Sequence, residues 1–80
     1  MYLRIIDRVE KKDFLFSGYD SNKVGFCSWS QSPDLAQNIP ENDCQELVKF
    51  LILNGIYDTK RFKFEISKDC KMLSHFRKYY

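Results

Sequence analysis

The residue types that most often carry out covalent chemistry are few in this chain and poorly grouped. His75 is the one histidine, and the acid nearest to it in the sequence is Asp69, so it lacks the partners that a metal site or acid–base catalysis needs. Ser28, Ser30 and Ser32 lack the G-x-S-x-G turn that exposes a nucleophilic serine. We interpret the histidine as a surface residue and the serines as cap and turn residues. We therefore predict a protein that is not an enzyme and binds no cofactor or metal.

The cysteines give no sign of a structural cross-link. The chain has three of them, Cys27, Cys44 and Cys70, an odd number without C-x-x-C spacing. Disulfide frameworks and zinc clusters both use paired or closely spaced cysteines. We therefore predict reduced, buried thiols.

Charge is distributed unevenly along the chain. Residues 60–80 hold seven Lys or Arg and two Asp or Glu, a net charge of +5, whereas residues 1–59 hold six and nine, a net charge of −3. A field concentrated on one segment steers association with an oppositely charged partner in a way that the overall charge of +2 would not. The C-terminal segment is therefore the first candidate for a binding surface.

That segment also carries aromatic rings among its cations. Lys and Arg can bind a phosphate backbone while rings stack on bases, and the same groups can dock on a protein. The alternative is a final helix whose rings complete the core and whose lysines are only solvated. The predicted partner-binding residues are Arg61, Lys63, Lys68, Lys71, Phe76, Arg77, Lys78 and Tyr79.

Two smaller features leave alternatives open. The first is a group of acids that no positive charge interrupts, consisting of Asp34, Glu41, Asp43 and Glu46. They gather at predicted helix starts, where the helix dipole favours negative charge, but an acidic patch that grips an arginine-rich groove remains open. The second is Trp29 with Tyr2 or Tyr19, which is either an exposed anchor for a protein partner or, as is commoner in a small domain, part of the core.

The length of 80 residues fits a single domain, residues 1–80, with a small core. Alternating and β-branched patterns predict strands over residues 2–9, 14–19, 24–29 and 61–66, with turns at 10–13 and 20–23. The first strand mixes apolar Ile5 and Ile6 with the charged Arg4, a pattern that predicts a strand with one apolar face. A helical stripe predicts one main amphipathic helix over about residues 41–54. The fold class is therefore α+β: a three- to four-stranded antiparallel sheet packed against this helix, with a short C-terminal helix.

The main helix has the clearest signals. Asp43 and Glu46 have capping-box spacing at its start, and Asn54-Gly55 marks its end. A short helical turn is predicted before it, with Ser32 as the cap. The apolar stripe that should face the core consists of Cys44, Leu47, Val48, Leu51 and Ile52.

The two ends of the chain complete the prediction. At the C-terminal end, Asp69 is the expected cap of the short helix, with a further strand as the alternative. The N-terminal residues have no signal-peptide pattern, and no apolar run is long enough to cross a bilayer. We therefore expect a cytoplasmic protein that has no membrane partner.

The order of these elements, with the strand from Phe26 to Ser30, the turn from Pro33 to Ala36 and the strand from Phe62 to Ile66, resembles small accessory proteins of tailed bacteriophages. The resemblance covers residues 14–67, and the segment after Ser67 departs from it. It implies a counter-defence role in the host cytoplasm, because such proteins include anti-CRISPR proteins and inhibitors of toxin or restriction nucleases, which bind without catalysis. It carries over no binding residues, since these inhibitors differ in their contact surfaces.

Two hypotheses follow for the function. In the first, the chain is a phage-type inhibitor that docks on a host nucleic-acid-processing defence protein or ribonucleoprotein through Arg61, Lys63 and residues 68–80. In the second, the same residues form a small RNA- or DNA-binding module, whose affinity would fall steeply as the salt concentration rises.

Overall fold

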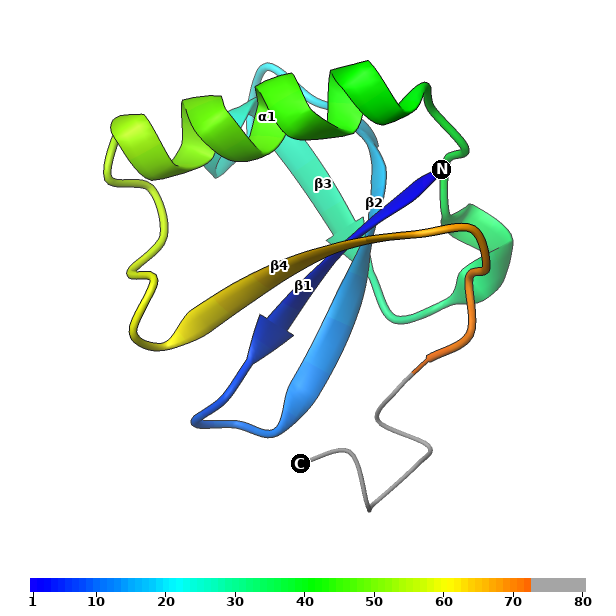
Figure 1. The fold of residues 1–80 in the computed structure, drawn as a ribbon, viewed down its shortest axis with the longest axis horizontal. Coiled ribbons are helices and arrows are strands. Elements are labelled where there is room, and N and C mark those ends of the chain that lie inside the picture. The colour runs from blue at the N-terminus through cyan, green and yellow to red at the C-terminus, as the bar shows by residue number, and fades with distance from the viewer. Residues whose placement is uncertain (73–80) are drawn as a thin grey trace.

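The computed structural model describes residues 1–72, which form a four-stranded antiparallel sheet and one α-helix (Figure 1). In chain order the elements are β1 (Tyr2–Asp7), β2 (Lys12–Tyr19), the 3-10 helix η1 (Val24–Phe26), β3 (Cys27–Ser30), the 3-10 helix η2 (Pro33–Leu35), α1 (Glu41–Leu53) and β4 (Phe62–Ser67). The predicted α+β class, the antiparallel sheet and the main helix are therefore confirmed.

The first strand of the chain is a central strand of the sheet. The strand order is β3-β2-β1-β4, and Arg4 lies opposite Leu15 of β2 and Glu65 of β4. Every residue from Leu3 to Asp7 is buried, because strands cover both edges of β1 and other parts of the chain cover both of its faces. The prediction of a single apolar face was therefore incomplete.

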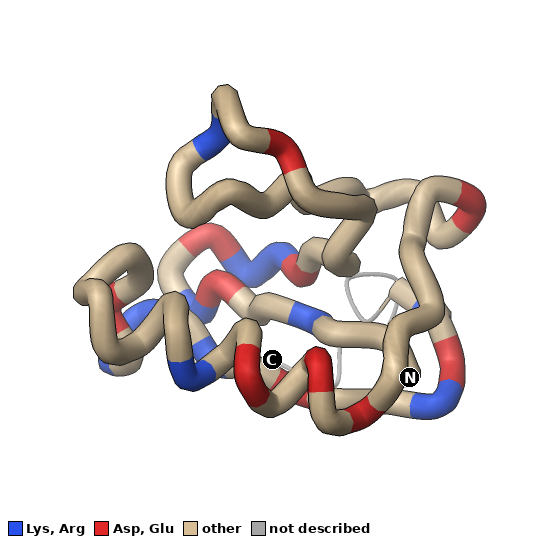
Figure 2. Tube along the Cα trace, turned by 90° about the horizontal axis from the view of Figure 1, so that it is seen from above, with Lys and Arg blue, Asp and Glu red and all other residues tan. Residues whose placement is uncertain are grey.

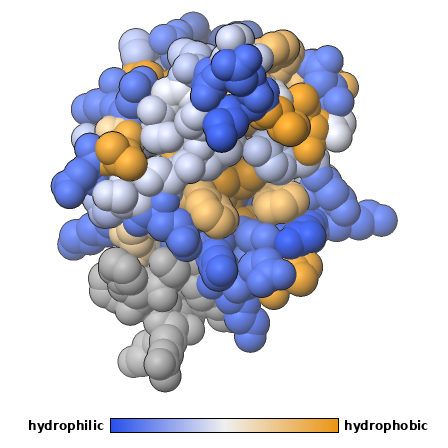
Figure 3. Space-filling model, turned by 180° about the vertical axis from the view of Figure 1, so that it is seen from behind, coloured by the Kyte–Doolittle hydropathy of each residue, from blue (hydrophilic) through white to orange (hydrophobic). Residues whose placement is uncertain are grey.

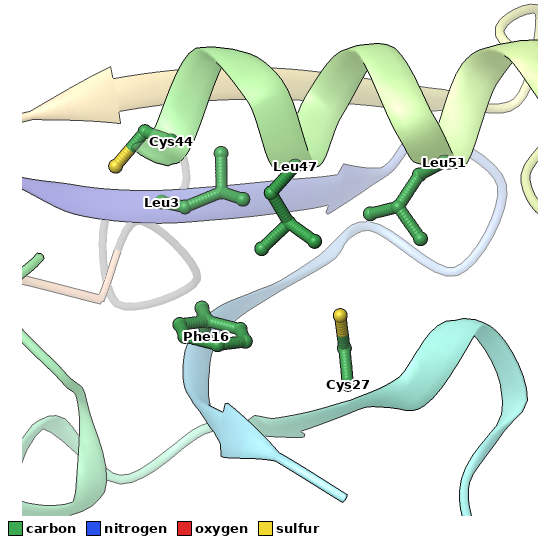
Figure 4. Close-up of a cluster of buried hydrophobic side chains, with 6 residues drawn as sticks. All are labelled: Leu3, Phe16, Cys27, Cys44, Leu47 and Leu51. Carbon is green, nitrogen blue, oxygen red and sulfur yellow. The ribbon is translucent and has the colours of Figure 1, made fainter. Parts of the chain in front are cut away.

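The core on the helix side lies between α1 and the sheet (Figure 4). Its buried side chains come from three strands and from one side of the helix, and they are Leu3, Phe16, Cys27, Cys44, Leu47 and Leu51. Full burial of one such leucine stabilises the fold by about 1.5–3 kcal/mol. Of the predicted stripe, Val48 is half-buried and Ile52 is exposed, so the buried stripe is narrower than the spacing suggested.

The start of α1 differs from the prediction. The N-cap residue is Pro40, and the amide of Cys44 already donates to the Pro40 carbonyl at 3.1 Å, which is the first helical hydrogen bond. Asp43 is therefore the third residue of the helix and not its cap. The predicted capping box of Asp43 and Glu46 is wrong, and both carboxylates remain on the exposed side of the first turns.

The end of α1 matches the prediction. Gly55 adopts a φ of 63°, in the left-handed region that glycine tolerates best. Its amide donates to the carbonyl of Ile52, and the amide of Ile56 donates to that of Leu51, each at 3.1 Å. This pair of bonds is the Schellman pattern, and it turns the chain from the helix towards β4.

The segment predicted as a strand over residues 24–29 is wrong in its first half. Val24, Gly25 and Phe26 form η1, and only Cys27–Ser30 pairs with β2. The reason is the backbone of the turn, since Gly25 has a φ of 69° and Phe26 a φ of 60°, values that no strand accommodates. Hydrogen bonds hold the turn, with the Asp20 amide donating to the Phe26 carbonyl at 2.9 Å.

Other boundaries shift by a few residues. The first hairpin turn lies at residues 8–11 and not 10–13, because the Asp7 carboxylate accepts the amides of Val9 and Glu10 and ends β1 there. The predicted helical turn is confirmed as η2, although the side chain of Ser32 makes no cap hydrogen bond. Residues 69–72 are not helical, and the rest of the predicted C-terminal helix lies outside the described residues.

The face of the sheet opposite α1 buries charge. The register places Arg4 and Ile6 on this face together with Leu15 and Asp13 of β2. Nη1 of Arg4 donates to Oδ2 of Asp13 at 3.0 Å, and the two side chains are 2% and 0% exposed. The same Nη1 donates to the carbonyl of Lys71, so the segment after β4 runs along this face.

Candidate binding surfaces

The predicted basic surface begins with Arg61, whose charge already has a partner within the chain. Nε and Nη2 of Arg61 donate to the two carboxylate oxygens of Asp7, at 3.0 and 2.9 Å. This hydrogen bonding is the main reason that the pKa of Asp7 falls to about 2, and it raises the pKa of Arg61 in return. Arg61 therefore ties the loop before β4 to the end of β1.

The other predicted cations differ in how they are held. Lys63, an exposed residue of β4, lies 3.3 Å from a carboxylate oxygen of Glu65, so its charge is also partly matched. Lys68 and Lys71 are exposed in the segment that follows β4. The remaining predicted site residues, Phe76, Arg77, Lys78 and Tyr79, lie outside the described residues.

A different surface lies between η1 and α1. It is a groove of ≈ 290 Å³ in which apolar and aromatic side chains predominate. Two carboxylates complete its lining, and no lysine or arginine of residues 1–72 takes part in it. The lining residues are Tyr19, Gly25, Phe26, Asp43, Glu46, Leu47 and Phe50.

The turn of η1 exposes apolar side chains by means of an unusual backbone. Val24 is 74% exposed and Phe26 is 56% exposed, although both are apolar. A bulky residue with positive φ is strained by about 1–3 kcal/mol, so a fold keeps one only where its surroundings impose it. Here a Cβ on Gly25 would lie 2.8 Å from Cδ2 of Leu51, which shows how closely the turn is pressed against α1.

The rings of the groove contact one another across two elements. The centroids of Phe26 and Phe50 are 6.4 Å apart with the ring planes tilted by 36°, within the range of favourable aromatic pairs. Tyr19 packs edge-on against Phe16 at 5.0 Å and leaves much of its own ring exposed. Seen from behind, the molecule shows apolar side chains grouped among hydrophilic ones (Figure 3).

The carboxylates of the groove come from the first half of α1, where Figure 2 shows the acids of the helix. The charge of Asp43 reaches Tyr19, because the pKa of the Tyr19 hydroxyl is raised first by partial desolvation and then by this carboxylate. Rings and negative charge therefore share one small surface. Sequence reasoning noted the uninterrupted acids but placed Phe26 in a strand, so it missed their juxtaposition.

A second set of rings surrounds Trp29. Trp29, Tyr57 and Phe64 pack together with centroids 6.0 to 6.5 Å apart, and they cover the core of the helix side. The indole N–H of Trp29 is buried and forms no hydrogen bond of standard geometry. Burial raises the pKa of the Tyr57 hydroxyl, and the nearby indole N–H makes this rise smaller. This packing supports the interpretation of Trp29 as a core residue.

The thiols do not form a reactive group. All three cysteines are free, but only Cys27 and Cys44 are buried as predicted, since Cys70 is half-buried. Burial raises the pKa of the Cys27 and Cys44 thiols, so both stay protonated at neutral pH. Residues 1–72 contain no cluster of three side chains suited to a metal ion. Within the same residues, the one α-helix is too short and too polar to cross a membrane.

Comparison of the chain with protein-family models, with curated proteins and with solved structures gave no match.

Proposed function

We propose that this chain acts by binding another protein, without catalysis, and that the groove between η1 and α1 is the contact surface. The observation that carries the proposal is Phe26, whose exposed ring is presented by a backbone with a φ of 60°. Such strain raises the free energy of the folded state, and the ring, although it packs on Phe50, stays 56% exposed and so buries little surface in return. A ring held in solvent at this cost is explained if it contacts a partner.

The groove favours a protein over a nucleic acid as the partner. Two carboxylates and no cation of the described residues line it, so the negative charge of a phosphate backbone would be repelled. Aromatic rings with a polar rim are what protein interfaces use as anchors. The resemblance to small phage proteins implies a counter-defence role, so the partner class within this proposal is a defence protein of the host cytoplasm.

The alternative, a nucleic-acid-binding module, is supported by Lys68 and Lys71, which are both exposed and lie three residues apart in the segment after β4. The pairing of Arg61 with Asp7 and of Lys63 with Glu65 weakens the case for this alternative, because these cations are already partly matched within the chain. If it is correct, the chain will bind generic RNA, and the logarithm of the affinity will fall steeply with the logarithm of the salt concentration.

A random peptide library displayed on phage tests the proposal with a defined probe. The full chain is immobilised, and selected peptides are then measured against the Phe26→Asn variant. Asn tolerates positive φ, so the variant removes the ring without disturbing the turn. We expect at least tenfold weaker binding, since an anchor ring contributes about 1.4 kcal/mol or more.

The matched control is Leu53→Ser. Leu53 is 78% exposed on α1 but does not line the groove, so its replacement should leave the affinity of the same peptides unchanged. Peptides whose affinity is the same for the wild-type chain and for Phe26→Asn would contradict the proposed site.

A further inference from the structure

We infer that the partner is recognised through an arginine next to an apolar side chain, with the guanidinium held by Asp43 and Glu46 over the rings of the groove and the apolar side chain lying between Phe26 and Phe50. This inference rests on the proposed function and adds the chemistry of the partner. It depends on where the carboxylates stand relative to the rings.

The two carboxylates are placed to hold one cation together. Asp43 and Glu46 are three residues apart on α1, so their Cβ atoms are about 5–6 Å from each other on one side of the helix. Both side chains line the groove and are exposed. Neither forms a hydrogen bond or an ion pair with another residue among positions 1–72, in contrast to Asp7 and Asp13.

The rings beside these carboxylates favour arginine over lysine. A guanidinium is planar, donates in two directions to carboxylates and stacks on aromatic faces, whereas an ammonium group is a compact and strongly hydrated charge. Tyr19 and Phe26 line the same groove as Asp43 and Glu46. One guanidinium can therefore contact acid and ring at once.

The apolar part of the groove suits an apolar neighbour of that arginine. Its lining includes Leu47, Gly25 and the paired rings of Phe26 and Phe50. An apolar side chain placed there would cover rings that are now 56% and 38% exposed. The occupant is thus a short segment of another protein with both residue types side by side.

The displayed peptide library also tests this inference. We expect the peptides that depend on Phe26 to be enriched in an arginine adjacent to Leu, Ile, Met or an aromatic residue. The best of them is then synthesised with its arginine replaced by lysine or by citrulline, which keeps the shape and removes the charge. We expect about threefold weaker binding with lysine and about tenfold with citrulline.

Charge-neutral variants of the chain give the matching test. The double variant Asp43→Asn with Glu46→Gln should bind the arginine peptide about tenfold more weakly than the wild-type chain does. It should bind the arginine and citrulline peptides with the same affinity. Glu41→Gln is the matched control, because Glu41 is exposed in the same first turn of α1 but does not line the groove. It should leave both affinities unchanged.

The outcomes separate the two proposals. Neutral or acidic peptides that bind through Phe26, or arginine peptides that bind the double variant as tightly as the wild type, would overturn this inference and leave the proposed function standing. The absence of any Phe26-dependent peptide would overturn both. Analytical ultracentrifugation of the wild-type chain gives a last outcome. Self-association that the double variant abolishes would mean that a second copy of the chain occupies the groove, and it would also overturn this inference.

Discussion

The two faces of the sheet are closed by different chemistry. On the helix side, α1 buries an apolar cluster that continues into the groove with its exposed rings. On the opposite side, the segment after β4 meets a buried ion pair between Arg4 and Asp13, and Met72 is buried as well. One face is therefore an ordinary core with an unpartnered apolar edge, and the other is a charged interior that the chain satisfies itself.

This difference teaches which charges are available to a partner. Of the four predicted cations among residues 1–72, two are engaged within the chain, since Arg61 pairs with Asp7 and Lys63 lies beside Glu65. The segment that holds Lys71 also serves the fold, because its backbone carbonyl accepts from Arg4. By contrast, Asp43 and Glu46 between η1 and α1 form no hydrogen bond or ion pair within residues 1–72.

The largest expected effect tests the charged face. Arg4→Leu removes the guanidinium and leaves Asp13 buried without this partner, which typically lowers the free energy of unfolding by about 3–5 kcal/mol. Urea denaturation of the variant measures the loss. The double variant Arg4→Leu with Asp13→Leu should recover part of it, because it removes the buried charge as well as its partner.

Leu51→Ala provides the comparison on the apolar face. Leu51 is fully buried against the sheet, so its truncation should lower the free energy of unfolding by about 2–5 kcal/mol. Unlike the loss in Arg4→Leu, this loss has no charged partner whose replacement would recover part of it. If Arg4→Leu proves nearly neutral while Leu51→Ala is severe, the ion pair does not contribute to closing its face. The segment after β4 would then be freer to bind than the structure indicates.

The sequence contained more information about the apolar face than about the charged one. The period-two pattern of β4 and the spacing along α1 predicted most of the residues that these two elements bring to the core, because both elements have one apolar side. The end of α1 was also predictable, since Asn54-Gly55 is a local signal. Such features depend on residues that are close in sequence.

The charged face and the groove depend on contacts between distant residues. Arg4 looks like a solvated residue until β1 becomes a central strand and Lys71, far along the chain, supplies its carbonyl. Phe26 looks like a strand residue, since nothing in its immediate sequence announces a positive φ. The acids were visible as a group, but their closeness to a ring required the packing of η1 on α1.

A smaller effect tests whether the groove is maintained for function. Phe26→Asn replaces a strained exposed ring by a residue that tolerates positive φ, and we expect the free energy of unfolding to rise by about 0.5–1 kcal/mol. Chemical denaturation measures it, with Val24→Asn as the control, because Val24 is also exposed but has no positive φ. The control should give no such rise, and a loss of stability in Phe26→Asn would show that the ring serves the fold.

The last prediction concerns how far the basic surface is free. Because the pKa of Asp7 is lowered from 3.8 to about 2, mainly by its hydrogen bonds with Arg61, the pair stabilises the fold fully above about pH 4 and loses this contribution as the pH falls through about 2. Carboxyl chemical shifts followed by NMR should show this low titration in the wild type. In Arg61→Gln the Asp7 pKa should move back towards 3.8, while Lys63→Gln, which alters a cation that lies beside Glu65, should leave it unchanged. If Asp7 of the wild type titrates near 3.8, then Arg61 is not held by it in solution, and the guanidinium of Arg61 would be as available to a partner as the carboxylates of the groove.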